Sequence, residues 1–243
     1  MPEPTVSRET ARLEFVDALL DRSGRVGPIR LSFQSGEWVA ILGANGAGKS
    51  SLLRLAAGAV RPTDGRCRVQ GRDPRAWTGL DRARALCHLP QRTPDTGGYT
   101  VREQIQASAA TPESVPFALE ATGLVPLADR SLATLSGGER RRSALAAVLA
   151  QESRCLLLDE PFSGLDPNIS ESIAAALATI ARAGALVMVA LHDPELALRH
   201  ATRVVAMRQG IVELDLPTGE STRGALRQAL HLDRHLDEGL TLA

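Results

Sequence analysis

The sequence of 243 residues lacks the long apolar segments and paired cysteines that mark membrane-embedded and disulfide-stabilised proteins. Its longest apolar runs, such as residues 185–191, fall far short of the ~20 residues that a membrane-spanning helix needs. The N-terminus has no basic stretch followed by an apolar one, so no secretory signal is expected. The three cysteines, Cys67, Cys87 and Cys155, form neither a CxxC pair nor an even set, which indicates reduced thiols in a cytosolic protein, with Cys155 in the core.

An excess of charge of either sign is also missing. Lys and Arg total 28 and Asp and Glu total 28, so the formal net charge is zero. A neutral chain argues against a protein built mainly to bind polyanions, and no nucleic acid is expected among its partners. Lysine itself occurs once, at Lys49, and all the other basic residues are arginine. That single lysine suggests a place that needs a compact ammonium rather than a planar guanidinium.

What the chain does contain is an ordinary globular composition, with 44% hydrophobic residues and a mean hydropathy of -0.06. This composition excludes wholesale disorder. At about 150 residues per domain, the length favours one domain with an insertion.

The order of apolar patterns predicts an α/β domain with a helical insertion. Strands are predicted over residues 12–20, 29–33, 38–42, 65–71, 83–89, 154–158 and 185–191, with a hairpin over 203–214 that turns at Gln209 and Gly210. Helices are predicted over residues 51–59, 101–110, 114–123, 137–150, 168–183, 194–200 and 222–236, after a polar, frayed start at residues 1–11. Strands alternate with helices at both ends of the chain, and a helical block lies between them.

The most specific motif is GANGAGKS at residues 43–50, which matches GxxxxGKS/T between a buried strand and a helix. Glycines let successive backbone N–H groups turn toward phosphate oxygens, and the helix N-terminus adds partial positive charge. Lys49 is expected to reach the β- and γ-phosphates of a nucleotide, and the Ser50 hydroxyl to ligate Mg²⁺. A glycine-rich turn without a ligand is the alternative. The predicted nucleotide-binding residues of this segment are Gly43, Asn45, Gly46, Ala47, Gly48, Lys49, Ser50 and Ser51.

A second motif is the apolar run CLLLDE at residues 155–160, which ends in two carboxylates. Asp159 is expected to hold Mg²⁺, through water, and Glu160 to take a proton from the water that attacks the γ-phosphate. A strand that ends in a solvated acidic turn is the alternative.

A third motif, LSGGE at residues 135–139, places Ser136 before a helix N-terminus and so forms another anion site. Both anion sites can serve one nucleotide if Ser136 acts on the ATP of a second subunit.

These motifs form an ordered series that resembles the ATP-binding subunits of ABC transporters over residues 12–215. The series is GANGAGKS (43–50), Gln91, LSGGE (135–139), LLLDE (156–160), SGLD (163–166) and His192. The resemblance implies a P-loop NTPase (RecA-like) core with an antiparallel β subdomain and an inserted α-helical subdomain. It places the first part of the core and the β subdomain at residues 1–92, the helical subdomain with its signature motif at 93–150, and the second part of the core with a C-terminal helix at 151–243.

The resemblance also implies an ATPase that works as a head-to-tail homodimer with two ATP molecules and Mg²⁺ at its interface. Each ATP would contact residues 43–50 of one copy and Ser136, Gly137 and Gly138 of the other. Gln91 would bind the Mg²⁺ or water site, Asp166 would connect the two sites across the dimer, and His192 would bond the γ-phosphate. Taken alone, Gln91 would be a surface glutamine and His192 a strand-end histidine. The implied catalytic set is therefore Glu160, His192 and Gln91, with Ser50, Gln91 and Asp159 at the metal.

Two departures from the family pattern stand out. Glu139 takes the place of the usual glutamine, and residues 20–26 contain no aromatic side chain to stack on adenine, which leaves Leu20, Arg25 or Val26 for that contact. Phe15 and Phe33 are expected in the core. The run from Arg140 to Arg142 is interpreted as a solvated or interface face rather than as a nucleic-acid site.

By the same resemblance, the partners are integral membrane permease subunits and an extracytoplasmic substrate-binding protein, and the location is the cytoplasmic face of the membrane. Residues 86–91 (LCHLPQ) and 100–103 (TVRE) are similar to the importer ATPases for iron-siderophore, haem and vitamin B12. A zinc or manganese importer, or an exporter, stays open as an alternative. A soluble ABC ATPase without a transport role is the remote one.

Overall fold

A six-stranded sheet forms the centre of the computed structural model, which describes residues 12–20, 26–91 and 98–230. Its strand order is β5-β6-β7-β3-β8-β9, parallel throughout except for the antiparallel pair β8 and β9. These strands are β3 (Trp38–Leu42), β5 (Cys87–Leu89), β6 (Cys155–Asp159), β7 (Leu186–Ala190), β8 (Arg203–Arg208) and β9 (Ile211–Pro217). Every residue of β3, β6 and β7 is buried, as expected for parallel strands that are covered on both faces.

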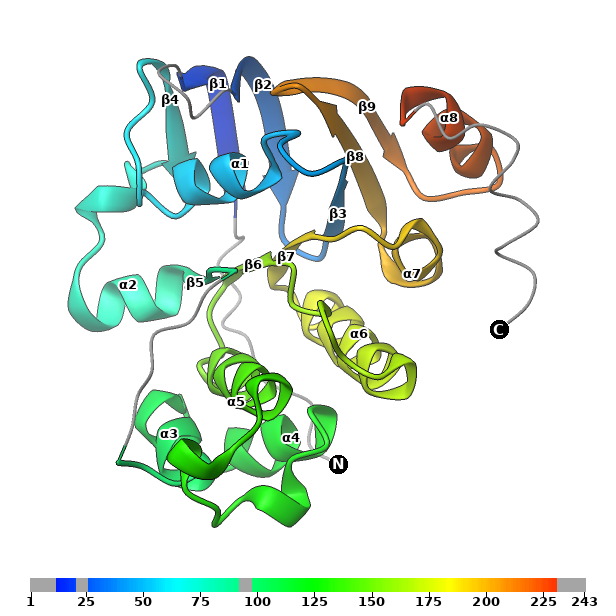
Figure 1. Ribbon diagram of the computed structural model, residues 1–243. Helices are drawn as coiled ribbons and strands as arrows, with labels where there is room; N and C mark the ends of the chain where they lie inside the picture. Colours follow the sequence, from blue (N-terminus) through cyan, green and yellow to red (C-terminus); the bar gives the residue numbers. More distant parts are fainter. Residues whose placement is uncertain (1–11, 21–25, 92–97, 231–243) are drawn as a thin grey trace.

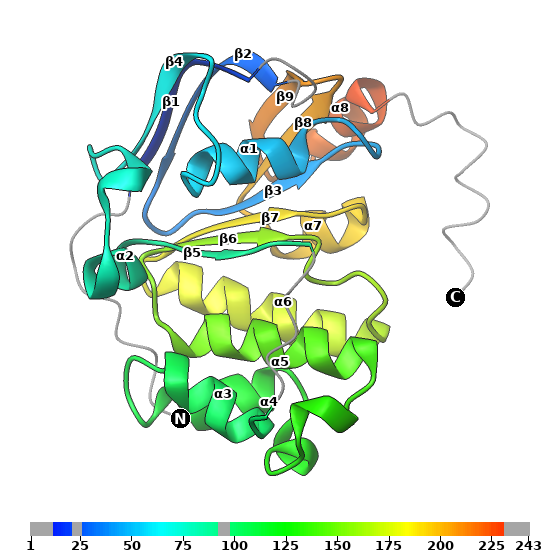
Figure 2. The ribbon, with the colours of Figure 1, turned by 60° about the vertical axis from the view of Figure 1, so that its left-hand side comes forward.

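A second, antiparallel sheet lies on one side of the first. It has the order β2-β1-β4 and consists of β1 (Arg12–Leu20), β2 (Val26–Gln34) and β4 (Asp64–Val69). Helix α1 (Lys49–Ala56) lies between the two sheets, as Figure 2 shows, and buries Leu52, Leu53 and Leu55. One hydrophobic cluster joins these leucines to the inner faces of both sheets, so the start of α1 is held rigidly against the sheet edge.

Helices cover the opposite face of the six-stranded sheet (Figure 1). Next to the sheet lie α5 (Gly137–Ala150) and α6 (Pro167–Arg182), and α3 (Val101–Ser108) and α4 (Ser114–Ala121) pack against them. The remaining helices are α2 (Gly79–Ala85), α7 (Pro194–His200) and α8 (Thr222–Ala229), with single turns at η1 (Pro74–Ala76), η2 (Val125–Leu127) and η3 (Leu132–Thr134). Among the described helices, none is both long enough and apolar enough to cross a membrane.

The predicted fold class is confirmed: an α/β core carries an antiparallel β subdomain and an inserted group of helices. The strand predicted over residues 83–89 is wrong for its first half, because α2 occupies 79–85 and only residues 87–89 pair with β6. Arg82 holds that helix in place by donating to the carbonyl oxygens of Pro74 (2.9 Å) and Ala57 (2.8 Å). The predicted frayed start, the end of the last helix after residue 230 and the subdomain boundary at 92/93 lie outside the described residues.

The three cysteines are free, and Cys67 and Cys155 are buried. Burial raises the pKa of the Cys67 and Cys87 thiols to about 12. The pKa of the Cys155 thiol is raised further. Burial is the main cause, and the nearby thiols of Cys67 and Cys87 add to it. The placement of Cys155 in the core is therefore confirmed.

Candidate nucleotide-binding site

The loop that links β3 to α1 is shaped by glycine. Gly43, Gly46 and Gly48 have φ angles of 155°, 79° and 104°, in the region that L side chains rarely adopt. A Cβ on Gly43 would also lie 2.3 Å from the carbonyl oxygen of Met207, so no other residue fits there. The loop also contains Asn45 and Ala47, and α1 begins at Lys49, so that Ser50 and Ser51 lie in its first turn. The result is a tight turn that ends at a helix N-terminus, which suits an anion.

Lys49 is directed into this turn. Its Nζ donates to the carbonyl oxygens of Gly43 (2.7 Å) and Ala44 (3.2 Å), and the residue is only 4% exposed. Burial lowers the pKa of Lys49, and the nearby carboxylates of Glu160 and Asp159 oppose that shift. A compact ammonium group is therefore held against the phosphate loop, as the single lysine of the sequence suggested.

Ser50 and Asp159 meet at the edge of the sheet although 109 positions separate them in the sequence. The Ser50 Oγ donates to Asp159 Oδ1 at 3.0 Å. Asp159 is 3% exposed, and burial raises its pKa while the bond from Ser50 opposes that rise. A hydroxyl and a carboxylate oxygen at this separation are the hard oxygen donors that Mg²⁺ prefers, so the residues present fit the metal that the motifs imply.

Glu160 follows β6 with a φ of 50°, a left-handed conformation that costs a non-glycine residue free energy. Its backbone N–H donates to the carbonyl oxygen of Ala190 at 2.9 Å. Its carboxylate accepts a bond from Gln91 Nε2 at 2.9 Å and lies 2.7 Å from His192 Nε2. The structure thus brings the three predicted catalytic side chains into direct contact, from the ends of β5, β6 and β7.

The segment from Ser136 to Gly138 forms the first turn of α5. Ser136 accepts a bond from the backbone N–H of Glu139 (3.3 Å), and the Glu139 carboxylate accepts one from the backbone N–H of Ser136 (2.7 Å). This capping box gives Glu139 a structural role and lowers its pKa, chiefly through the bond from the Ser136 backbone. Nothing lies within 4 Å of a Cβ built on Gly137, so the turn is open on that side.

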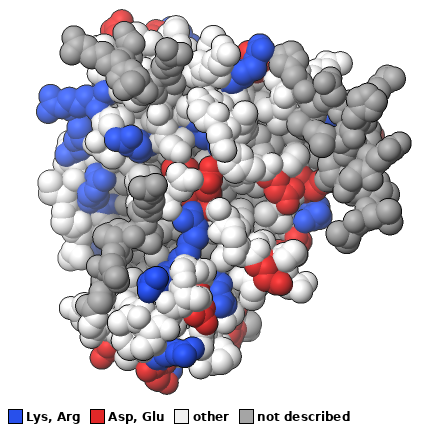
Figure 3. Space-filling model, viewed as in Figure 1, with Lys and Arg blue, Asp and Glu red and all other residues white. Residues whose placement is uncertain are grey.

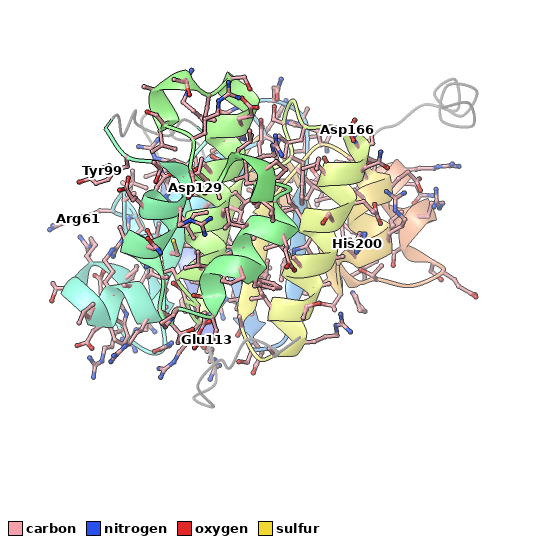
Figure 4. The ribbon with its side chains drawn as sticks, turned by 90° about the horizontal axis from the view of Figure 1, so that it is seen from below. Arg61, Tyr99, Glu113, Asp129, Asp166 and His200 are labelled. Carbon is pink, nitrogen blue, oxygen red and sulfur yellow. The ribbon has the colours of Figure 1, made fainter. Side chains whose placement is uncertain are left out.

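Asp166 is exposed and caps α6, where its side chain accepts a bond from the Asn168 N–H at 2.8 Å. Figure 4 shows it projecting at the edge of the molecule. Within the described residues, no hydrogen bond joins Asp166 or Ser136 to the phosphate loop. One copy of the chain therefore brings together the loop, the predicted metal ligands Ser50 and Asp159 and the predicted catalytic side chains, and no hydrogen bond among the described residues ties Ser136 or Asp166 to them.

Sequence reasoning missed Arg141. Residues 140–142 are predicted as a solvated or interface face; the solvated part of that interpretation is wrong for two of the three residues, and the interface part stays a prediction. Arg142 donates to the carbonyl oxygens of Thr122 (2.9 Å) and Gly123 (3.1 Å) at the end of α4. Arg141 donates to backbone carbonyls beside the catalytic carboxylate, and only Arg140 is exposed. A run of three arginines carries no signal that separates these roles, because the direction of each side chain depends on how α5 packs.

The adenine-binding prediction falls partly outside the described residues, since these do not include Arg25. Val26 is buried at 2% exposure, and Leu20 is partly exposed. Phe15 and Phe33 pack edge to face in the core with ring centroids 6.5 Å apart, so their placement in the core is confirmed. On the face of the molecule seen in Figure 1, Figure 3 shows basic and acidic side chains interspersed, with basic ones prominent along the left side.

Comparison with known proteins gives one consistent family. The sequence model of the family described as "ABC transporter" matches residues 26–163. A hemin import ATP-binding protein, HmuV, of Pseudomonas entomophila is 39% identical over 219 residues, which cover 84% of this chain and 86% of that protein. The HmuV protein of Nocardia farcinica is 38% identical over 216 residues, covering 82% and 75%.

Solved structures agree with the fold. The cbiO1 protein of Clostridium perfringens, part of the ABC transporter complex cbiONQ, has a TM-score of 0.70 at 26% identity and covers 94% of this chain and 97% of its own. A dimeric post-hydrolysis state of the ATP-binding cassette MJ0796, bound to ADP and Pi, has a TM-score of 0.73 at 22% identity and covers 86% and 99%. At 22% identity, the similarity to the MJ0796 cassette supports the fold alone.

Proposed function

The chain belongs to the ABC transporter family as an ATP-binding subunit of an importer, and from that premise we propose that it hydrolyses ATP at this site to drive haem uptake through a membrane permease. The observation that carries the ATPase part is the contact of Glu160 with Gln91 and His192 next to the Ser50–Asp159 pair. The haem part rests on relatives named as hemin import ATP-binding proteins that share 36–39% of their residues with this chain. Iron-siderophore and cobalamin belong to the same proposed class of cargo.

The residues of the site have separate tasks in the proposed reaction. The N–H groups of residues 43–50 and the Lys49 ammonium bind the β- and γ-phosphates. Ser50 and Asp159 would hold Mg²⁺, which would supply charge neutralisation for the phosphate oxygens when bound. A water oxygen attacks the γ-phosphorus, the bond to the β–γ bridging oxygen breaks, and the proton of the water passes to the Glu160 carboxylate. Gln91 and His192 orient that carboxylate and the phosphate.

The site is proposed to be completed by a second copy of the chain, arranged head to tail. Ser136 and Gly138 lie at the N-terminus of a 14-residue helix and are partly or fully exposed, which suits an anion that comes from outside the chain. Asp166 would link the two sites across the interface. Closing the dimer requires ATP because each γ-phosphate is held from both sides, and loss of that phosphate releases the contact.

The partners follow from this cycle. We place the subunit at the cytoplasmic face of the membrane, bound to permease subunits that receive cargo from an extracytoplasmic substrate-binding protein. The described part of the helical segment, residues 98–150, would move as a unit and pull on the permease at the surface beside Gln91.

The experiment is to co-purify the chain with its permease subunits and reconstitute the complex in lipid nanodiscs. ATP hydrolysis is then measured with the substrate-binding protein and haem, an iron-siderophore, cobalamin, Zn²⁺ or Mn²⁺. Stimulation by haem, lost in the Glu160→Gln complex, is the expected result. Stimulation by a bare metal ion alone would replace haem with metal import. Hydrolysis without any permease partner would favour a role outside transport.

A further inference from the structure

Arg141 connects helix α5 to two loops of the catalytic edge. It lies in the second turn of α5, and its guanidinium reaches three backbone carbonyl oxygens on two other segments. The Nη1 group donates to Gln91 O at 2.6 Å, and the Nη2 group donates to Asp159 O at 2.9 Å and also to Glu160 O. A planar fork carries its N–H groups on three separate nitrogens and so reaches carbonyls on two segments, whereas the three N–H groups of a lysine ammonium share one nitrogen.

These bonds act on the backbone that aims the catalytic carboxylate. Both backbone polar groups of Glu160 are engaged: the N–H donates to Ala190 O at 2.9 Å, and the C=O accepts bonds from Arg141 and from the Ser163 N–H at 3.2 Å. The residue is kept at a φ of 50°, which persists only where the surroundings enforce it. Arg141 also holds the backbone of Gln91, whose side chain bonds the same carboxylate. Removing the guanidinium would therefore loosen the backbone beneath two of the three side chains, Glu160 and Gln91, and leave the Glu160 backbone with only its bonds to Ala190 and Ser163.

We propose that Arg141 is a positioning residue for ATP hydrolysis, which keeps Glu160 and Gln91 in their working geometry through their backbone carbonyls. The inference rests on the proposed function of this site. Ser136, five residues earlier, caps the N-terminus of the same helix, so Arg141 also links the turn offered to the second copy with the catalytic carboxylate of its own copy. The competing account is that Arg141 only fastens α5 to the sheet, in which case its loss would weaken folding and nucleotide binding together.

The test compares Arg141→Met and Arg141→Lys with Arg140→Met, the exposed neighbour on the same turn, in the full chain assembled with its permease. We expect kcat to fall at least 10-fold in Arg141→Met and by an intermediate factor in Arg141→Lys, which keeps the charge and fewer of the bonds. KM for ATP and the Kd of a fluorescent ATP analogue should stay within about twofold, as should all values for Arg140→Met. An unchanged kcat, or a kcat that falls in step with Kd and melting temperature, overturns the proposal.

A double-mutant cycle supplies an independent readout. If Arg141 acts through Glu160, then Arg141→Met should change single-turnover hydrolysis less than twofold in a Glu160→Gln background. A further 10-fold loss there would overturn the proposal. Should Arg141→Met fail to fold, Arg141→Gln, which keeps a single side-chain NH₂ group as donor, takes its place in both tests. A wild-type complex that hydrolyses ATP without responding to haem would refute the proposed cargo and leave the test of Arg141 intact.

Discussion

His88, in the short edge strand β5, should make the stability of the protein sensitive to acid. Its Nε2 is buried and has no hydrogen-bond partner among the described residues. Burial, aided by the positive charges of Arg54 and Arg82, lowers the pKa of His88 from 6.5 to about 4. The unfolded chain therefore binds a proton here between these two values when the folded chain does not, and stability falls as the pH drops below 6.5 toward 4.

The size of the effect follows from the two pKa values. With about 1.4 kcal/mol for each pKa unit, the free energy of unfolding should fall by about 2 kcal/mol between pH 8 and pH 5 through His88 alone, and by about 3 kcal/mol once the pH is below 4. At a urea dependence near 3 kcal/mol per M, the first figure corresponds to a midpoint about 0.7 M lower.

Urea titrations at pH 8 and pH 5, followed by tryptophan fluorescence, measure this loss. His88→Leu puts an apolar side chain of similar size in place of the imidazole and removes the titration. Its free energy of unfolding should therefore fall by about 2 kcal/mol less than that of the wild type between pH 8 and pH 5. Arg54→Gln, which removes one of the charges, should give an intermediate loss. Equal losses in wild type and His88→Leu would refute the reasoning, because all other titrating groups are shared by the two proteins.

Three further substitutions test the nucleotide site. Lys49→Ala should weaken the binding of a fluorescent ATP analogue and abolish nearly all turnover, because it removes the ammonium held in the loop; turnover at the wild-type level would contradict the assignment of the loop. Glu160→Gln should bind ATP and hydrolyse it about 10²- to 10⁴-fold more slowly, with a stable ATP-bound dimer in light scattering; unchanged turnover would exclude Glu160 as the base. Ser136→Arg should block turnover and leave nucleotide binding by the single copy intact, as measured by fluorescence titration; a loss of binding would show that Ser136 serves its own copy.

The motifs at the strand ends could be predicted from the sequence because each depends on local order. When GANGAGKS directly follows an apolar strand, the glycines of the motif have few conformations open to them. Parallel strands in turn bring their carboxyl ends to one edge of a sheet. Hence Ser50 and Asp159, 109 positions apart, were expected at one metal and lie 3.0 Å apart. The contact of Gln91 and His192 with Glu160 follows from the same topology.

What the sequence could not predict depends on packing between distant segments. The alternation of apolar residues before Leu89 favours a strand, whereas Arg82 stabilises a helix there by bonding the end of α1 and the turn at Pro74. The sequence does not indicate which backbone carbonyls Arg141 and Arg142 bond, because that depends on how α5 packs against the sheet and against α4. The arrangement of two copies is likewise a property of surfaces, so the partner of Ser136 stays a prediction.

The unreactive thiols of the core give the chain a practical advantage. With a pKa of about 12, the Cys67 and Cys87 side chains are thiolate in only about one molecule in 10⁵ at pH 7, and Cys155 in fewer. A new cysteine at an exposed position, such as Arg140→Cys, would be thiolate at a few per cent. A maleimide dye or spin label would then attach to α5 alone, with every native cysteine left in place. In the proposed dimer, one probe on each copy would report, as a distance, how far the two α5 helices approach each other during turnover.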